Sequence, residues 1–344
     1  MAAHRGGGRM PILLLPMMAL LLLGVAGGAW RLGADWLPLT HTGLVYHGAL
    51  MVNGFFATLI SCERCVAHGR GWAWLVPASG LLASASLWWR PELAPALYGL
   101  LAAGMTILSW QLWRRQPQDF TLLLVLACGA LLLANLDWWR QGAVGAATER
   151  GWLVFLVLTI AAERLELSRL LPKPRWAKRV FMGLALGLLA APWLPLGHLW
   201  LGAALVGLAL WLLRFDIARK TIKSRGLPRY VAACLLAGYG WLGLSGLLWL
   251  GGGGDMALHG VMLGFVMAMV FGHAPVIAPA LLKIQCHYHW LLYLPLALLQ
   301  LGLLARHDWP RLSAQLTSLA ILGFVLTFVG VQLAGYLQRR QEVR

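Results

Sequence analysis

Residues 121–139 read TLLLVLACGALLLANLDWW, an apolar run that contains a single acidic residue. Similar runs of about twenty residues, rich in Leu, Ala and Gly, follow one another along the chain and match the length of an α-helix that crosses a bilayer. The strands of a membrane β-barrel would be shorter and would alternate polar with apolar residues. The sequence therefore predicts an all-α, polytopic membrane helical bundle.

The composition excludes an ordinary soluble domain. Hydrophobic residues make up 60% and charged residues 12% of the chain, and the mean hydropathy is +0.72, which leaves too few charges to cover a water-exposed surface. The formal charge of +16 is distributed over the ends of the apolar runs, as in membrane proteins. The chain also has no glycine loop with a phosphate-binding lysine, so neither nucleic acid nor a nucleotide is an expected partner.

Hydropathy windows predict about twelve membrane-spanning helices in a single domain over residues 1–344. If the N-terminus is inside, 22 of the 28 Lys and Arg residues fall in cytoplasmic segments and six fall outside. This alternation predicts that both ends are cytoplasmic, in a bacterial inner membrane with its lipids as partners. The first run could instead be a cleaved signal peptide. The helices are expected near residues 10–29, 43–63, 72–89, 93–113, 121–139, 151–168, 178–194, 196–213, 229–250, 256–281, 288–305 and 312–336.

Two histidines lie near the expected outer ends of the second and tenth helices. His47 and His259 would lie at similar depth, because both helices are expected to run inward, and each is followed by a glycine that would let a flat ligand approach the backbone. A low-spin haem iron takes two imidazoles from opposite sides, which facing helices can supply. The pattern indicates a haem site; alternatively, each histidine bonds a buried partner or caps a helix.

His273 is a candidate for a second metal ligand. It follows His259 by fourteen residues, which in a continuous α-helix places both near one face and His273 in the inner leaflet. The alternative is structural, because Pro275 and Pro279 interrupt the helix and His273 could bond the carbonyl groups that they leave free.

A third group of donors is expected at the cytoplasmic surface. Cys62, Cys65 and His68 end the second helix, and a cysteine and two histidines follow the tenth. If those helices are neighbours, zinc or copper could bind there; alternatively, the thiols are reduced and unliganded. The odd number of cysteines argues against a disulfide framework. The second half of this group is Cys286, His287 and His289.

The segment His47-Gly48-x-x-Met51, early in the second of twelve predicted helices, resembles the low-spin haem segment of subunit I of haem-copper oxidases. That subunit also has twelve helices with both ends inside, and its tenth helix supplies the opposing haem ligand, as His259 would here. The sixth and seventh helices of this chain lack the histidines that hold the oxidase's copper. The resemblance therefore implies a haem site without that copper centre.

The chain is more similar to the NnrS family, bacterial membrane proteins that bind haem and copper and are linked to nitric oxide stress. The resemblance rests on His47-x3-Met51-x2-Gly54-Phe55 and on His259 followed by Phe271-Gly272-His273. It implies a b-type haem with His47 and His259 as axial ligands, and His273 as a possible copper ligand.

The first hypothesis is thus a haem-binding inner-membrane protein for electron transfer or for handling nitric oxide or related redox stress, with a redox partner or a larger membrane complex. Two alternatives stay open. One is a transporter or channel in which Glu63, His259 and His273 form a polar path. The other is a structural subunit of a larger respiratory complex. The sequence identifies no catalytic residue.

Overall fold

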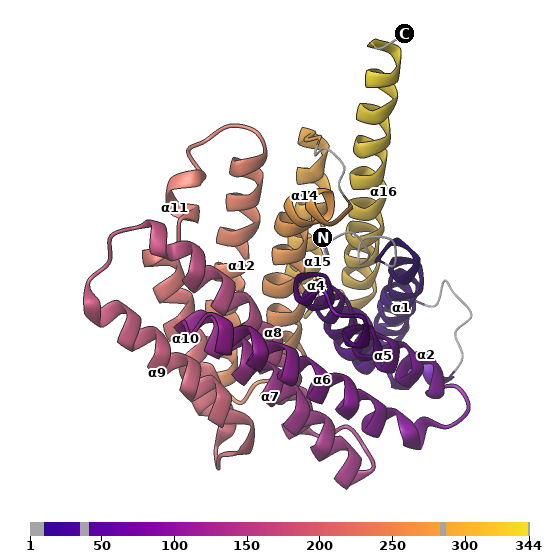
Figure 1. The fold of residues 1–344 in the computed structure, drawn as a ribbon, viewed down its shortest axis with the longest axis vertical. Helices are drawn as coiled ribbons and strands as arrows, with labels where there is room; N and C mark the ends of the chain where they lie inside the picture. Colours follow the sequence, from indigo (N-terminus) through magenta and orange to yellow (C-terminus); the bar gives the residue numbers. More distant parts are fainter. Residues whose placement is uncertain (1–9, 35–40, 283–286, 343–344) are drawn as a thin grey trace. The chain divides into compact units, whose positions relative to one another are not determined.

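The computed structural model describes residues 10–34, 41–282 and 287–342, which are helices joined by short turns (Figure 1). These described segments contain no strand, so the predicted all-α fold is confirmed. Their surface exposes large apolar side chains, among them Leu100, Leu210 and Leu326, which are 62%, 62% and 72% exposed. Such side chains suit contact with lipid.

Eight helical segments in the described part of the chain are long and apolar enough to cross a membrane. The protein is therefore a multi-pass membrane protein, as the sequence predicts. The eight segments are Leu13–Arg31, His47–His68, Pro91–Arg115, Asp119–Gln141, Gly197–Phe215, Leu227–Leu250, Asp255–Ile277 and Pro310–Gly335.

Four further helices, α5, α8, α9 and α15, lie where the sequence predicts additional crossings. α5 (Leu75–Ser86), α9 (Arg175–Ala190) and α15 (Tyr293–Leu304) are shorter than the eight segments. α8 (Ala146–Leu167) has the length of a membrane span but includes five charged residues. Length and hydropathy therefore establish eight of the twelve predicted crossings.

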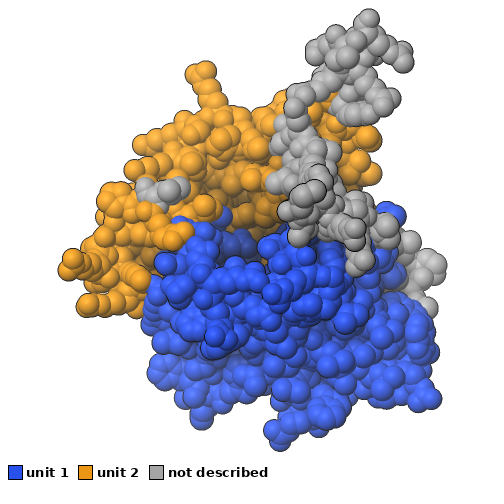
Figure 2. Space-filling model, viewed as in Figure 1, with its two compact units in different colours: residues 1–31, 35–166, 182–201 blue, residues 32–34, 167–181, 202–344 orange. Residues whose placement is uncertain are grey.

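The chain divides into two compact units (Figure 2). Unit 1 comprises residues 1–31, 35–166 and 182–201, and unit 2 comprises residues 32–34, 167–181 and 202–344. Each unit is described by itself, and the single domain over residues 1–344 stays a prediction.

Unit 1 contains the helices of the first half of the chain, including α5 and most of α8. It also includes parts of α9 and α10 (Gly197–Phe215), with η5 (Ala191–Trp193) between them. Its other elements are α1 (Met10–Arg31), α2 (His41–Val45), α3 (His47–Ala49), η1 (Leu50–Ala57), α4 (Thr58–His68), η2 (Gly71–Trp74), η3 (Pro91–Leu93), α6 (Ala94–Arg115) and α7 (Asp119–Gln141).

Buried amide and aromatic side chains form the core of unit 1. Asn135 Nδ2 of α7 donates to Asn53 Oδ1 of η1 at 2.9 Å and to the Tyr98 carbonyl oxygen of α6 at 3.2 Å. Trp152 Nε1 of α8 donates to Asn135 Oδ1 at 2.9 Å. The Trp138 ring contacts both Tyr98 and Trp152. One amide thus connects four helical elements, and its polar atoms are satisfied inside an apolar core.

Unit 2 contains most of the second half of the chain, including α15 and the remaining parts of α9 and α10. Its other elements are η4 (Ser168–Leu170), α11 (Ala218–Thr221), α12 (Leu227–Leu250), α13 (Asp255–His259), η6 (Gly260–Met267), α14 (Ala268–Leu282), η7 (Trp290–Leu292) and α16 (Pro310–Glu342).

Aromatic contacts join helices inside unit 2. The rings of Phe271 on α14 and Phe324 on α16 are stacked, with centroids 4.2 Å apart. Phe181 meets Trp211 edge to face at 4.5 Å, and the indole nitrogen of Trp211 donates to the Ala177 carbonyl at 2.7 Å. These contacts join α14 to α16, and α9 to the next helix along the chain, α10.

Candidate functional site

His259 is oriented by an acidic side chain one turn earlier in α13. Its Nδ1 atom lies 2.9 Å from Oδ1 of Asp255 and 3.0 Å from the backbone oxygen of the same residue. Both oxygens can only accept from the ring, so Nδ1 carries a proton, and in the neutral ring Nε2 carries the lone pair. A carboxylate on one ring nitrogen is the arrangement that orients histidine ligands of metals. His259 therefore has the geometry of a ligand residue.

Arg306, which follows α15, holds the carboxylate of Asp255 in place. Its Nε and Nη2 atoms lie 2.6 Å and 3.1 Å from the two oxygens of Asp255. Paired contacts of this kind fix the plane of the carboxylate as well as its position. The Arg306 side chain is 7% exposed and that of His259 19%. Asp255, His259 and Arg306 thus form a half-buried polar cluster in unit 2.

His47 has different surroundings in unit 1. Arg31 Nη1 of α1 lies 3.3 Å from His47 Nδ1, and because a guanidinium group only donates, Nδ1 accepts and the neutral ring carries its proton on Nε2. The ring lies beside Gly28 of α1, where an added Cβ would be 3.7 Å from its Cδ2 atom. This arrangement does not fit ligation of a metal through Nε2, which would require the proton to move to Nδ1 and the Arg31 contact to break.

Protein side chains occupy the space beside the glycines that follow the two histidines. A Cβ at Gly48 would lie 3.7 Å from the Trp152 ring, and a Cβ at Gly260 would lie 2.2 Å from the hydroxyl oxygen of Ser245. Gly260 therefore allows α12 to approach closely, whereas a methyl group at Gly48 would be in ordinary van der Waals contact. The structure gives no support for the expectation that they admit a flat ligand.

Both histidines precede a π-helix of eight residues, η1 after His47 and η6 after His259. In η1 the Thr58 backbone N–H donates to the Asn53 carbonyl, five residues back, and the Thr58 hydroxyl donates to the same oxygen at 2.8 Å. π-Helices are rare and are frequent at functional sites. Sequence reasoning missed both, although the two segments share His-Gly at the start and Gly-Phe within.

His273 bonds within its own helix, α14. Its Nδ1 atom lies 2.7 Å from the Met269 carbonyl oxygen, one turn earlier. This oxygen is not the Phe271 carbonyl oxygen, which Pro275 leaves without a backbone donor. The prediction that His273 and His259 lie near one helix face also assumed a continuous α-helix, which the structure does not have. η6 lies between them, and each extra residue that a wide turn holds shifts the helix face by about 100°.

The thiols near the end of the second span are buried. Cys62 and Cys65 are 0% and 1% exposed, and Cys65 Sγ donates to the Ala73 carbonyl at 3.0 Å. The His68 ring contacts Trp72 edge to face, with centroids 5.5 Å apart. These contacts join the end of α4 to η2.

The later histidines of this predicted donor group take part in backbone contacts in unit 2. The backbone N–H of His287 donates to Gln332 of α16 at 3.0 Å, and Gln332 returns a bond to the His287 carbonyl at 2.9 Å. His289 Nδ1 accepts from the Leu291 N–H at 3.3 Å. Cys286 lies outside the described residues.

Within the described ranges, no three His, Cys, Asp or Glu side chains gather as a metal site. The structure does bring His259 together with two residues that sequence reasoning missed, Asp255 and Arg306. Asp255 could have been found, since it lies four residues before His259 and thus on the same helix face. Arg306, far along the chain, had no such signal. His47 belongs to unit 1 and His259 to unit 2.

The helices and the polar clusters in them define a multi-pass α-helical membrane protein. The chain belongs to the family described as a domain of unknown function, DUF8744, which matches residues 9–333. No curated protein and no solved structure matches the chain. These comparisons give no support to the NnrS family or the oxidase subunit, so those resemblances stay predictions.

Proposed function

We propose that the protein binds haem in a bacterial inner membrane, with His259 as an axial ligand. The Asp255–His259 pair carries this proposal. It leaves the Nε2 lone pair available to a metal while the carboxylate holds Nδ1–H, which orients the ring and raises its basicity. A b-type haem, held by side-chain ligands alone, is the group that the resemblance to NnrS implies.

The sequence motif predicts His47 as the second axial ligand, and ligation would exchange its Arg31 contact for the metal. The haem would serve electron transfer or the handling of nitric oxide or related redox stress, as proposed from the NnrS resemblance. His273 remains the candidate for a copper ligand, as the resemblance to NnrS implies. Twelve crossings with both ends in the cytoplasm are part of this proposal.

The test is the absorption spectrum, haem content and metal content of the full chain, purified in detergent after expression with added haem. We expect a Soret band that His259→Ala and His47→Ala remove. Asp255→Asn should weaken haem binding about 10–100-fold, the usual loss for an outer-shell partner of a metal ligand. His307→Ala is the matched control, since His307 is an exposed histidine in the same unit.

Colourless wild-type protein, or a band that survives His259→Ala, would overturn the proposal. Colourless protein that moves a substrate across liposome membranes in a His273-dependent manner would instead identify a transporter or channel. Loss of the Soret band in His259→Ala but not in His47→Ala would support haem binding by His259 and would show that a residue other than His47 is the second axial ligand.

A further inference from the structure

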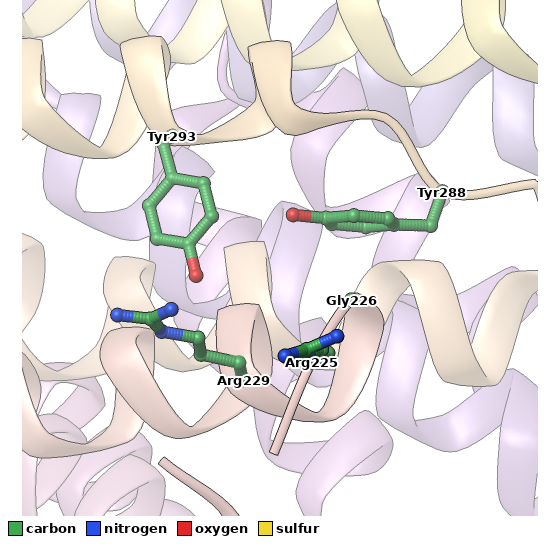
Figure 3. Close-up of a pocket in the computed structure, with 5 residues that line it drawn as sticks. All are labelled: Arg225, Gly226, Arg229, Tyr288 and Tyr293. Carbon is green, nitrogen blue, oxygen red and sulfur yellow. The ribbon is translucent and has the colours of Figure 1, made fainter. Parts of the chain in front are cut away.

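Unit 2 contains a cavity of about 250 Å³ where α12 begins and where the chain enters η7 and α15 (Figure 3). Pockets that enclose a whole drug-sized ligand are larger, about 300–1,000 Å³, so this cavity suits a small group. It is distinct from the Asp255–His259–Arg306 cluster, because none of those residues lines it. Its walls are formed by Arg225, Gly226, Arg229, Tyr288 and Tyr293.

The lining combines two permanent positive charges with no negative charge. Arg225 and Arg229 are four positions apart and both are exposed. In the described part of the chain, neither guanidinium group forms an ion pair with a carboxylate. Guanidinium groups remain charged at any physiological pH and match the oxygen spacing of phosphate. The cavity is therefore suited to an oxyanion.

The two tyrosines supply hydroxyl groups opposite the arginines. Figure 3 shows both rings across the cavity from Arg225 and Arg229, with the Tyr293 hydroxyl directed towards Arg229. The buried ring of Tyr230 packs against both, with its centroid 5.2 Å from that of Tyr293 and 6.4 Å from that of Tyr288. This packing restricts the rings and leaves two hydroxyl donors beside the positive charges.

The backbone adds a smaller contribution of the same sign. Gly226 is the N-cap of α12 and has φ +68°, a conformation that favours glycine, and no side chain caps the helix. The positive end of a 24-residue helix therefore borders the cavity.

From these four features we infer that the cavity binds a phosphate group, held by Arg225 and Arg229 and by the hydroxyls of Tyr288 and Tyr293. Two sources share this chemistry. One is the headgroup of an anionic phospholipid, and the other is a small soluble phosphate monoester. The inference is independent of haem binding.

The experiment compares two double variants that each remove two positive charges from the same part of unit 2. Arg225→Gln/Arg229→Gln changes the cavity, whereas Lys220→Gln/Lys223→Gln changes residues outside it. One arm measures phosphatidylglycerol retained by the full chain from mixed phosphatidylcholine nanodiscs, by native mass spectrometry. The other measures the thermal shift caused by glycerol 3-phosphate in neutral detergent.

We expect the arginine variant to lose about tenfold or more in affinity in one arm, while the lysine variant keeps wild-type binding. Loss in the lipid arm assigns a phospholipid headgroup, and loss in the glycerol 3-phosphate arm assigns a soluble phosphate. Equal losses in the two double variants would show attraction to net charge and would overturn the inference, as would wild-type protein that binds neither probe. If the arginine variant misfolds, Tyr293→Phe replaces it, because this change removes one hydroxyl group and keeps the ring. It should weaken binding of whichever probe the wild-type protein binds.

Discussion

Asn135 shows how much a single buried amide decides in unit 1. Its side chain accepts from Trp152 and donates to Asn53 and to the Tyr98 carbonyl, so it joins η1, α6, α7 and α8. Asn135 belongs to the run 121–139, whose apolar length predicts a helix but not the partners of this side chain. Its partners are 17 to 82 positions away, and side-chain pairing over such intervals has no periodic signal in one sequence.

Replacing Asn135 by leucine, which has a similar volume, should destabilise the protein. The change leaves the Trp152 N–H and the Asn53 amide oxygen unsatisfied in a buried site, at about 1–3 kcal/mol for each group. We expect the free energy of unfolding, measured with sodium dodecyl sulfate in mixed micelles, to fall by at least about 2 kcal/mol. Leu136→Ala, at the neighbouring and 40% exposed position, is the control and should change stability little. An Asn135→Leu protein as stable as the wild type would contradict the role of the network.

At the scale of elements, the two histidine-bearing spans share a construction. In each, a His-Gly pair lies at or just before the start of a π-helix of eight residues, and an α-helix follows. Hydropathy located both spans, because apolar length does not depend on how the turns are wound. It could not reveal the π-helices, since the wide turns depend on contacts with neighbours. One such contact in η6 is Gly264, where an added Cβ would lie 2.4 Å from Cγ of Trp241 on α12.

Gly264→Ala should therefore lower stability, by about 1–3 kcal/mol, because the methyl group would collide with the ring of Trp241 in a packed interface. The matched control is Gly240→Ala on α12, where nothing lies within 4 Å of an added Cβ. That variant should be neutral or gain up to about 1 kcal/mol from the lower flexibility of alanine. Melting temperatures in detergent would measure both, and equal effects of the two variants would contradict the close packing of η6 on α12.

At the scale of the whole molecule, the distribution of basic residues predicts which loops face the cytoplasm. The turn after α6 should be inside and the turn after α7 outside. The structure makes a direct test practical, because Cys62, Cys65, Cys128 and Cys234 are buried and should react slowly with a membrane-impermeant maleimide.

We expect Ala143→Cys to be labelled in intact spheroplasts and Gln116→Cys to be labelled only after lysis, because both positions are exposed and α7 lies between them. The parent chain gives the background labelling. The reverse pattern would invert the proposed orientation, and labelling of both positions from one side would show that α7 does not cross the membrane.

The sequence by itself determined that the protein is helical, that it is a multi-pass membrane protein and where eight of its membrane-spanning helices lie. These properties follow from local apolar length and from the ends of apolar runs, which neighbouring residues specify. Only the tertiary structure decided the surroundings of the candidate ligands. It paired His259 with Asp255 and Arg306, set His47 against Arg31, and filled the space beside Gly48 and Gly260 with side chains. Apart from the Asp255–His259 pair, which lies within α13, those contacts join different elements of the chain, and the packing of whole helices decides which of them meet.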